Sequence, residues 1–230
     1  MRQNGIIVAI DGPAGAGKST TAKAVAERLR YLYLDTGAMY RAVALAAIRA
    51  KLDPDSADDV AGLAMELEID LLSSENGTRT FLGSEDVSDL IRTPEVSNTA
   101  SRIAVHSKVR KVMVGLQKMI GIDGGIVLEG RDTTTAIFPD AELKVFLEAT
   151  VEERTQRRLG EYTSNGVDRD LVQLKLEIQE RDDRDRETQS RHGSWPSPEA
   201  IRLDTTGLSI DEQVNRILGL AAGLGASEAR

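Results

Sequence analysis

The chain has 230 residues, of which 40% are hydrophobic and 29% charged, and its formal net charge is −8. Such a composition is ordinary for a globular protein, and the length suits one domain with a single core, with or without small insertions. The acidic balance argues against nucleic-acid binding, and no apolar run reaches the roughly 18 residues needed to cross a bilayer. The N-terminal apolar stretch is short, so we expect no signal peptide. The absence of cysteine excludes disulfides, cysteine metal sites and a thiol nucleophile, and fits a cytoplasmic protein.

The chain begins with the pattern strand, glycine loop, helix. Gly5–Asp11 is a short apolar run rich in β-branched residues, which is typical of a buried strand in a parallel sheet. Lys18–Arg30 follows with apolar side chains at helical spacing. We predict a second strand at Tyr31–Leu34 and an alanine-rich helix at Ala38–Ala50.

The next segment, about residues 53–92, has a different character. Two short strand candidates flank Asn76-Gly77, which is a typical hairpin turn. Local antiparallel strands within an α/β chain indicate an inserted subdomain. The elements expected here and just after are a helix at Ser56–Glu66, strands at Ile69–Leu72 and Thr78–Leu82, and helices at Pro94–His106 and Ser107–Ile120.

The alternation of strands and helices then resumes. The expected elements are strands at Gly125–Leu128 and Leu143–Leu147, a helix opened by Thr150 with Glu153 at the capping-box position, a helix over about Asp168–Arg184, a strand at Ile201–Leu203, and a last helix begun by the capping box of Ser209 and Glu212. This alternation predicts an α/β fold, with helices on both faces of a parallel sheet. Ligands bind such sheets at the carboxyl ends of the strands.

The glycine loop at Gly12–Ser19 (GPAGAGKS) fits the P-loop pattern G-x-x-x-x-G-K-[ST] at every fixed position. Its glycines let main-chain N–H groups turn toward a phosphate, and the following helix adds a favourable dipole. We expect Lys18 to reach the β- and γ-phosphates of ATP, and Ser19 to ligate Mg²⁺. The alternative, a glycine-rich turn with an exposed lysine, does not require the strand and helix that flank this motif. The predicted ATP-binding residues of the loop are Gly12, Pro13, Ala14, Gly15, Ala16, Gly17, Lys18, Ser19 and Thr20.

A P-loop does not identify the phosphate acceptor. The chain lacks the N-K-x-D or T-K-x-D motif of GTPases and the L-S-G-G-Q-like signature of transport ATPases, which favours a small-molecule kinase. A kinase must also neutralise an anionic acceptor, and arginine suits this role. Three arginine clusters are candidates: Asp35–Arg41, Gly130–Asp132, and Arg181–Arg186 at the end of a predicted helix.

The arginine clusters and the histidines also have simpler interpretations. Each cluster has the alternative of a solvated, salt-bridged surface. The two histidines, His106 and His192, lie far apart and show no ligand or triad pattern, so we expect no catalytic role for them.

Several longer segments resemble one known family in their order and spacing. These segments are GPAGAGKST, LDTGAMYRAVAL, EDVSDLIRTPEVSNTAS, the pair Val109-Arg110, EGRD with the following TAIFPDA, and ERDDRDR. From Ile6 to about Val214 the chain resembles bacterial-type cytidylate kinase, one of the nucleoside monophosphate kinases.

The resemblance implies an activity and an organisation. The activity is transfer of the γ-phosphate of ATP to CMP or dCMP with Mg²⁺, giving ADP and CDP or dCDP. The organisation is a P-loop core (residues 1–36 and 108–230), a nucleoside monophosphate-binding insert (37–107) with a small antiparallel sheet, and a helical lid at about 154–184. A cytoplasmic monomer without nucleic-acid or membrane partners is implied as well.

The same resemblance assigns roles to individual residues. Thr36, Arg41 and Arg131 are expected around the CMP phosphate, and Ser101, Arg110 and Asp132 around the cytosine and sugar. Arg181 and Asp185 are expected near the sugar and phosphate, and the lid arginines Arg154, Arg157 and Arg158 on the ATP phosphates. The residues implied in catalysis are Lys18, Arg131, Asp132, Arg181 and Asp185.

The chain departs from the family pattern at three positions. Thr134 replaces the glycine of G-R-D-[MI]-G-T, which is expected to alter the backbone beside the acceptor site. Glu129 stands where aspartate is common. Thr188 stands where many members have an arginine tied to the base, and Arg186 and Arg191 are the candidate substitutes.

Three other functions remain alternatives. The nearest is another small-molecule P-loop kinase, such as one for adenylate or shikimate, which the DTGAMYR and GRD segments argue against. A non-catalytic nucleotide-binding module or regulatory ATPase would not need three arginine clusters on the acceptor side. A nucleic-acid-binding ATPase is disfavoured by the net charge of −8.

Overall fold

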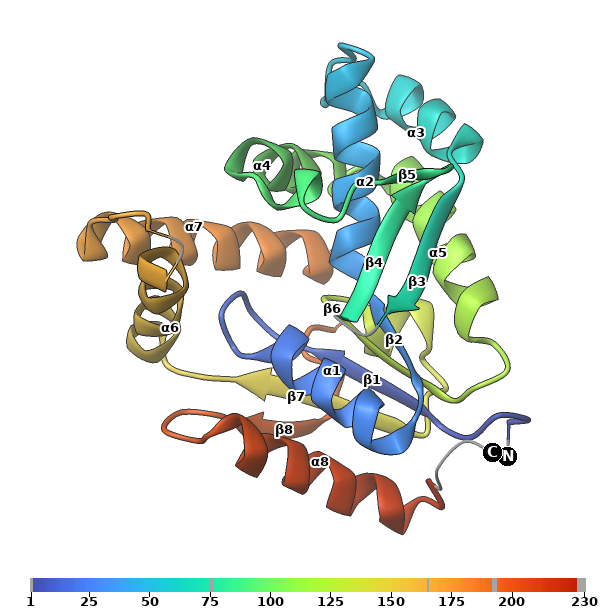
Figure 1. Cartoon of the computed structure of the whole chain (residues 1–230), viewed down its shortest axis with the longest axis vertical. Coiled ribbons are helices and arrows are strands. Elements are labelled where there is room, and N and C mark those ends of the chain that lie inside the picture. Colours follow the sequence, from blue (N-terminus) through green and yellow to red (C-terminus); the bar gives the residue numbers. More distant parts are fainter. Residues whose placement is uncertain (1, 75–76, 165, 192–193, 227–230) are drawn as a thin grey trace. The chain divides into compact units, whose positions relative to one another are not determined.

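The structure, a computed structural model, describes residues 2–74, 77–164, 166–191 and 194–226 (Figure 1). It divides into two compact units. The first unit consists of Met1–Tyr31 and Gly124–Arg230, and the second of Leu32–Asp123. No helix in the described part of the chain is both long enough and apolar enough to cross a bilayer.

A parallel sheet forms the centre of the first unit. Its strands are β1 (Ile7–Asp11), β6 (Ile126–Gly130), β7 (Leu143–Glu148) and β8 (Ile201–Asp204), which pair in the order β6-β1-β7-β8. Every residue of β1 and β6 is buried, as expected for strands in the middle of a parallel sheet. The predicted parallel sheet is therefore confirmed, with strand bounds within one or two residues of the prediction.

Two helices of the first unit, α1 (Lys18–Leu29) and α8 (Ile210–Gly223), pack against each other (Figure 1). The buried face of α1 carries the apolar residues Ala22, Val25, Ala26 and Leu29 at the predicted spacing. The capping box of α8 is complete, because Glu212 N donates to Ser209 Oγ and Ser209 N donates to the Glu212 carboxylate.

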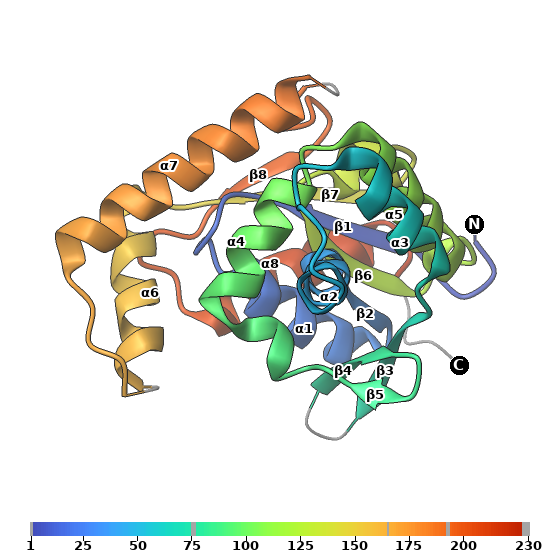
Figure 2. The same cartoon turned by 90° about the horizontal axis from the view of Figure 1, so that it is seen from above.

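The first unit also contains the helix pair α6 (Val151–Ser164) and α7 (Leu171–Ser190), which pack against each other (Figure 2). Helix α7 continues beyond the predicted end at Arg184, so the cluster Arg181–Arg186 lies inside the helix and not at its end. The chain has no glycine or proline between Leu171 and Ser190, and Arg186 and Arg191 pair with acidic residues of the same helix.

The predicted capping box at Thr150 and Glu153 forms only in part. Glu153 N donates to Thr150 Oγ1 at 3.2 Å. The Glu153 carboxylate instead accepts from Arg157 Nε at 3.1 Å, while Thr150 N donates to Thr206 Oγ1 at 3.2 Å. A tertiary contact thus replaces the second half of the local motif.

The second unit combines helices with a small antiparallel sheet, which agrees with the predicted hairpin strands. Its sheet has the order β3-β4-β5. In chain order the elements are β2 (Leu32–Asp35), α2 (Thr36–Arg49), α3 (Ala57–Glu66), β3 (Ile69–Ser74), β4 (Gly77–Leu82), β5 (Glu85–Asp86), the 3-10 turn η1 (Leu90–Arg92), α4 (Pro94–Ile103) and α5 (Ser107–Gly121). The predicted turn residue Asn76 lies outside the described residues. Strand β5 escaped prediction because two residues are too few to show an alternating pattern.

The end of β1 is tied to the segment after β6 by one buried carboxylate. Asp11 Oδ1 accepts from Thr133 N and Oγ1 at 2.9 and 2.7 Å. Its Oδ2 accepts from Thr134 N and Oγ1 at 3.0 and 2.5 Å. These bonds begin the π-helical turn η2 (Thr133–Ile137). Thr134, at the position where the resemblance implies a glycine, thus adds a hydroxyl donor to a carboxylate that has no exposed surface.

We predict that Asp11→Asn lowers the free energy of unfolding by about 3 kcal/mol, since an amide nitrogen would face two donors in a buried site. Urea unfolding at pH 7 measures this loss. Thr134→Val removes a single hydroxyl bond at nearly constant volume and is expected to cost only about 1 kcal/mol. An Asp11→Asn protein as stable as the Thr134→Val protein would contradict the role assigned to the carboxylate.

Candidate active site

The P-loop between β1 and α1 owes its curvature to three glycines. Gly12, Gly15 and Gly17 have φ values of 151°, 76° and 89°, which side chains other than hydrogen rarely allow. A Cβ atom at Gly12 would also clash with the main-chain oxygen of Leu147 in β7. The sequence pattern therefore reflects a backbone that only glycine can form at these positions.

Side chains bond three main-chain oxygens of this loop. Lys18 Nζ donates to Pro13 O at 2.9 Å, and Arg154 Nη1 donates to Ala14 O at 3.0 Å. Thr205 Oγ1 donates to Ala16 O at 3.2 Å. With these carbonyl groups occupied by protein donors, the loop is arranged to offer its N–H groups to an anion at the start of α1.

The hydroxyl of Ser19 lies beside a carboxylate from β6. Ser19 Oγ donates to Glu129 Oε1 at 2.6 Å. A hydroxyl and a carboxylate are oxygen ligands of the kind that Mg²⁺ prefers, so these residues fit the metal that a P-loop kinase uses. Among the described residues there is no group of three or more His, Cys, Asp or Glu side chains that could hold a metal by itself. Water and nucleotide phosphates would have to supply the other ligands.

Lys18 lies among other charged side chains with little access to water. Burial, together with the positive charge of Arg131, lowers the pKa of Lys18 to about 7. Glu129 and Asp185 act in the opposite direction, and Arg181 adds further repulsion. Lys18, Arg131, Arg181 and Asp185, predicted from separate motifs, therefore belong to one electrostatic group.

Arg131 and Asp185 form the central ion pair of this group. Arg131 Nε donates to Asp185 Oδ2 at 2.6 Å. Burial by itself would lower the pKa of Arg131, but the nearby charge of Asp185 outweighs burial and raises it. Burial likewise would raise the pKa of Asp185, but Arg131 and Arg181 outweigh it and lower it. Both partners are thus held in their charged forms.

The remaining predicted acceptor residue of the first unit, Asp132, is buried, and its main-chain oxygen accepts from the N–H groups that form η2. Thr188 lies in the last turns of α7. The two proposed substitutes for the missing arginine pair along the same helix, Arg186 with Asp183 at 3.2 Å and Arg191 with Glu187.

The other predicted acceptor residues belong to the second unit. Thr36 is buried at the start of α2, where Asp35 caps the helix by accepting from Ala38 N at 2.9 Å. Arg41 Nη2 donates to the same Asp35 carboxylate at 2.8 Å. Ser101 lies on α4 and the buried Arg110 on α5.

Of the two histidines, only His106 lies among the described residues, and no contact with the residues around Lys18 is seen for it. The His106 ring nitrogen lies 2.9 Å from the main-chain oxygen of Pro54, which is consistent with a structural role. His192 lies outside the described residues.

The sequence as a whole matches one family. The cytidylate kinase family matches residues 8–222. The chain belongs to the cytidylate kinase family. Cytidylate kinases from Bacillus thuringiensis (strain Al Hakam) and Bacillus anthracis (strain CDC 684 / NRRL 3495) are each 45% identical to it over 219 residues, covering 95% of this chain and 97% of theirs.

A solved structure shares the fold at low sequence identity. It is the crystal structure of an uncharacterized protein from Eubacterium ventriosum ATCC 27560, with a TM-score of 0.56 and 12% identity. The match covers 95% of this chain and 98% of that one. At this identity the likeness concerns the fold alone.

In this member of the cytidylate kinase family, the three arginines predicted for the lid have different surroundings. Arg154 is buried, donates through Nε to Ala149 O at 3.1 Å, and pairs with Asp182 at 2.7 Å. Arg157 Nη2 donates to Thr205 O at 2.6 Å. Arg158 is more exposed and pairs with Glu161 on its own helix at 2.6 Å.

The sequence analysis did not predict Thr205 and Gln213, and it gave no role to Asp182 within the cluster Arg181–Arg186. Asp182 lies four positions after Ile178, which is also buried, so helical periodicity was a usable signal for its inward orientation. Thr205 and Gln213 contact the P-loop or α1 from 189 and 192 positions away in the chain, and no local pattern marks them.

We predict that Lys18→Met changes the pH dependence of stability. The unfolded chain keeps a Lys pKa near 10.5, whereas the folded pKa is about 7, so the wild type gains stability as pH rises from 7 toward 10.5. At pH 6 to 7 the variant should be more stable than wild type by at least about 1 kcal/mol, a difference that shrinks toward pH 10.

Urea unfolding from pH 6 to 10 measures the difference. Lys111→Met, at an exposed position of α5, is the matched control and should follow the wild-type pH dependence. Parallel stability curves for Lys18→Met and Lys111→Met would show that Lys18 carries no such proton linkage.

Proposed function

We propose that this chain transfers the γ-phosphate of ATP to CMP or dCMP through the charged group around Lys18, giving ADP and CDP or dCDP. Membership in the cytidylate kinase family identifies it as an ATP-dependent kinase of these nucleotides. The structural observation that supports the mechanism is the P-loop lysine beside the Arg131–Asp185 pair, because the reaction joins two anionic substrates.

Transfer in this scheme depends on positioning and charge. Lys18 belongs to the loop that binds phosphates, and it stabilises charge on the γ-phosphoryl group as that group moves in line between the nucleotides. Arg131 and Arg181 counter the charge of the acceptor phosphate. The acceptor oxygen is already anionic, so the scheme requires no strong general base.

Mg²⁺ is proposed to act with ATP, held by Ser19 with Glu129 beside it. The 2.6 Å contact between the hydroxyl and the carboxylate supports this pair as the protein's part of the site. When bound, the ion neutralises phosphate charge. Glu129 then orients the Ser19 hydroxyl by accepting its hydrogen bond. The glutamate side chain is one methylene longer than the aspartate that is common at this position in the family pattern.

The acceptor site is proposed on the basis of the family resemblance. Residues of the second unit would form much of it, with residues 37–107 as the nucleoside monophosphate-binding insert and residues 1–36 and 108–230 as the P-loop core. Thr36, Arg41 and Arg131 would hold the CMP phosphate, Ser101, Arg110 and Asp132 would read the cytosine and sugar, and Arg181 and Asp185 would lie near the sugar and phosphate.

The helix pair α6 and α7 supplies the proposed lid, at about residues 154–184. Its arginines Arg154, Arg157 and Arg158 would move onto the ATP phosphates when it closes. A closed lid excludes water, which otherwise competes with CMP for the phosphoryl group. Ion pairs between the two helices, such as Lys175 with Glu152 at 2.6 Å, support their movement as one body.

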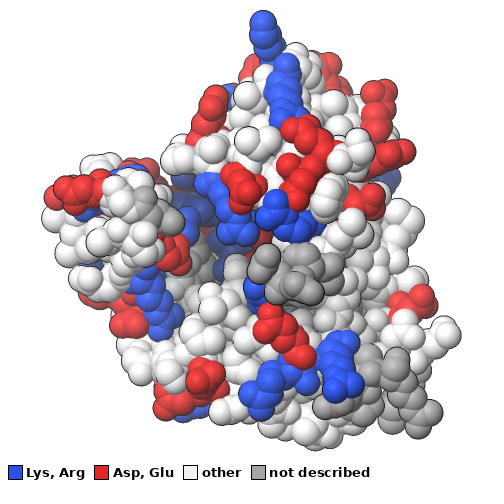
Figure 3. Space-filling model, viewed as in Figure 1, with Lys and Arg blue, Asp and Glu red and all other residues white. Residues whose placement is uncertain are grey.

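We also propose that the protein is a cytoplasmic monomer without nucleic-acid partners. On the face drawn in Figure 3, basic and acidic side chains form small patches that often adjoin one another. Such a mixture does not resemble the basic stripe of a nucleic-acid-binding surface.

The activity is tested by measuring ADP production with CMP, dCMP, UMP, AMP and shikimate as acceptors. We expect turnover with CMP and dCMP to exceed that with AMP and shikimate. Lys18→Ala, as the negative control, should reduce CMP-dependent turnover at least about 100-fold. A protein that phosphorylates another member of this set but not CMP would refute the assignment.

Asp132→Asn tests how the site distinguishes cytosine from uracil. An Asp132 carboxylate that accepts from the cytosine amino group favours CMP, and loss of such a bond changes discrimination by up to about 10⁴-fold. We expect the ratio of kcat/KM for CMP over UMP to fall in the variant. Asp211→Asn, the same substitution at an exposed position in the first turn of α8, is the matched control. A ratio unchanged by Asp132→Asn would remove Asp132 from base recognition.

A further inference from the structure

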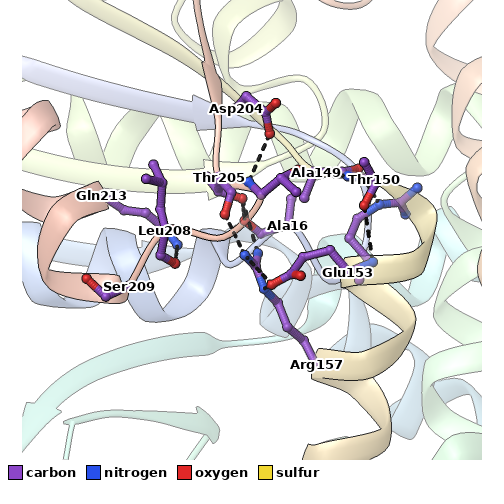
Figure 4. A network of polar contacts seen from close by, with 12 residues as sticks. Ala16, Ala149, Thr150, Glu153, Arg157, Asp204, Thr205, Leu208, Ser209 and Gln213 are labelled. Carbon is purple, nitrogen blue, oxygen red and sulfur yellow. Dashed lines mark hydrogen bonds and ion pairs between the residues drawn. The ribbon is translucent and has the colours of Figure 1, made fainter.

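Two buried polar residues beyond the P-loop contact it and the helix that follows it (Figure 4). Thr205 follows β8, and Gln213 lies in the first turn of α8. Both have no exposed surface. Neither belongs to a phosphate-binding motif, so their polar bonds require another explanation.

Thr205 connects the P-loop with the end of the sheet. Its hydroxyl lies 3.2 Å from Ala16 O and 3.1 Å from Glu148 O, and its main-chain N donates to Glu148 O at 2.7 Å. The last residue of β7 therefore fixes Thr205, and Thr205 holds the P-loop through its side chain.

Gln213 forms the second connection. Its Oε1 accepts from Thr21 Oγ1 at 2.7 Å, and its Nε2 donates to Leu208 O at 3.2 Å. A Cβ atom at Gly17 would lie only 3.0 Å from Gln213 Oε1, so the amide packs directly against the P-loop glycine. The capping box of Ser209 and Glu212 makes the start of α8 a firm support for this contact.

We propose that Thr205 and Gln213 are positioning residues that hold Ala16–Ser19 in its phosphate-binding shape before ATP arrives. This inference rests on the proposed role of the P-loop in binding ATP. Glycines make the loop flexible, and ordering a flexible loop on binding costs affinity. Because the hydroxyl and amide are fully buried, losing their partners is costly, and the bonds therefore restrict the loop strongly.

A double-mutant cycle on Thr21 and Gln213 tests the inference. Thr21→Val and Gln213→Leu each remove one side of the same bond, and the double variant removes both. The dissociation constant for ATP is measured by calorimetry without any acceptor. We expect each single change to weaken ATP binding about 5- to 10-fold, and the double change to weaken it no more than the worse single change.

Thr205 provides a separate comparison. Thr205→Val removes the hydroxyl, whereas Thr205→Ser keeps it and should restore ATP affinity to within about twofold of wild type. Arg157 Nη1 also donates to this hydroxyl, so Thr205→Val changes the surroundings of Arg157 as well as those of Ala16. The cycle on Thr21 and Gln213 does not involve Arg157, and it is therefore the decisive test. Asn215→Ala, at an exposed position of α8, is the matched control.

A purely structural role predicts a different result. It would lower the melting temperature of these variants while the folded proteins bound ATP within twofold of wild type, and this result would overturn the inference. If Gln213→Leu fails to fold, the nearly isosteric Thr21→Val carries the same test.

Steady-state kinetics of the same variants give a second readout. The KM for ATP should rise while the KM for CMP stays constant. A wild type that binds ATP but does not phosphorylate CMP would contradict the proposed function and leave this inference standing.

Discussion

The first unit buries several cationic side chains close to one another. The repulsion between these charges is the constraint on which the arrangement of the site depends. Lys18, Arg131 and Arg181 repel one another in the ligand-free protein. Asp185 and Glu129 compensate without neutralising the group completely, which leaves a site ready for anions. Burial and the repulsion from Arg131 both disfavour the charged form of Lys18, and the lowered pKa of this lysine reflects that cost.

A buried carboxylate connects two strands of the scaffold around these cations. Asp11 ties β1 to the turn after β6 with four hydrogen bonds, and the turn leads directly from the Arg131–Asp132 segment. Thr134 contributes two of these bonds, one through its main-chain N–H and one through its hydroxyl. Its side chain thus helps to hold the turn that follows β6.

Local patterns made most of the fold predictable. The apolar run of β1, the glycine loop and the helical spacing of α1 are adjacent in sequence, so strand, loop and helix were all correct. The antiparallel strands β3 and β4 were equally predictable, because their sequences flank the hairpin-type pair Asn76-Gly77. The end of α7 was not predicted correctly. Residues that favour helices continue past Arg184, and no glycine or proline marks the end of the helix there.

The site itself was predictable only where motifs mark it. The P-loop and the arginine clusters carry such motifs, whereas the bond between Ser19 and Glu129 joins positions 110 apart, and the bonds of Thr205 and Gln213 span even more of the chain. No periodicity encodes such contacts. They arise from the order of strands in the sheet, which brings the ends of β6, β7 and β8 to the glycine loop.

The burial of the P-loop lysine links its protonation to the binding of phosphate. With a pKa of about 7, Lys18 is only partly protonated near neutral pH when no nucleotide is bound. The negative charge of a phosphate favours the charged form of Lys18, so the binding of a phosphate and the protonation of this lysine favour each other.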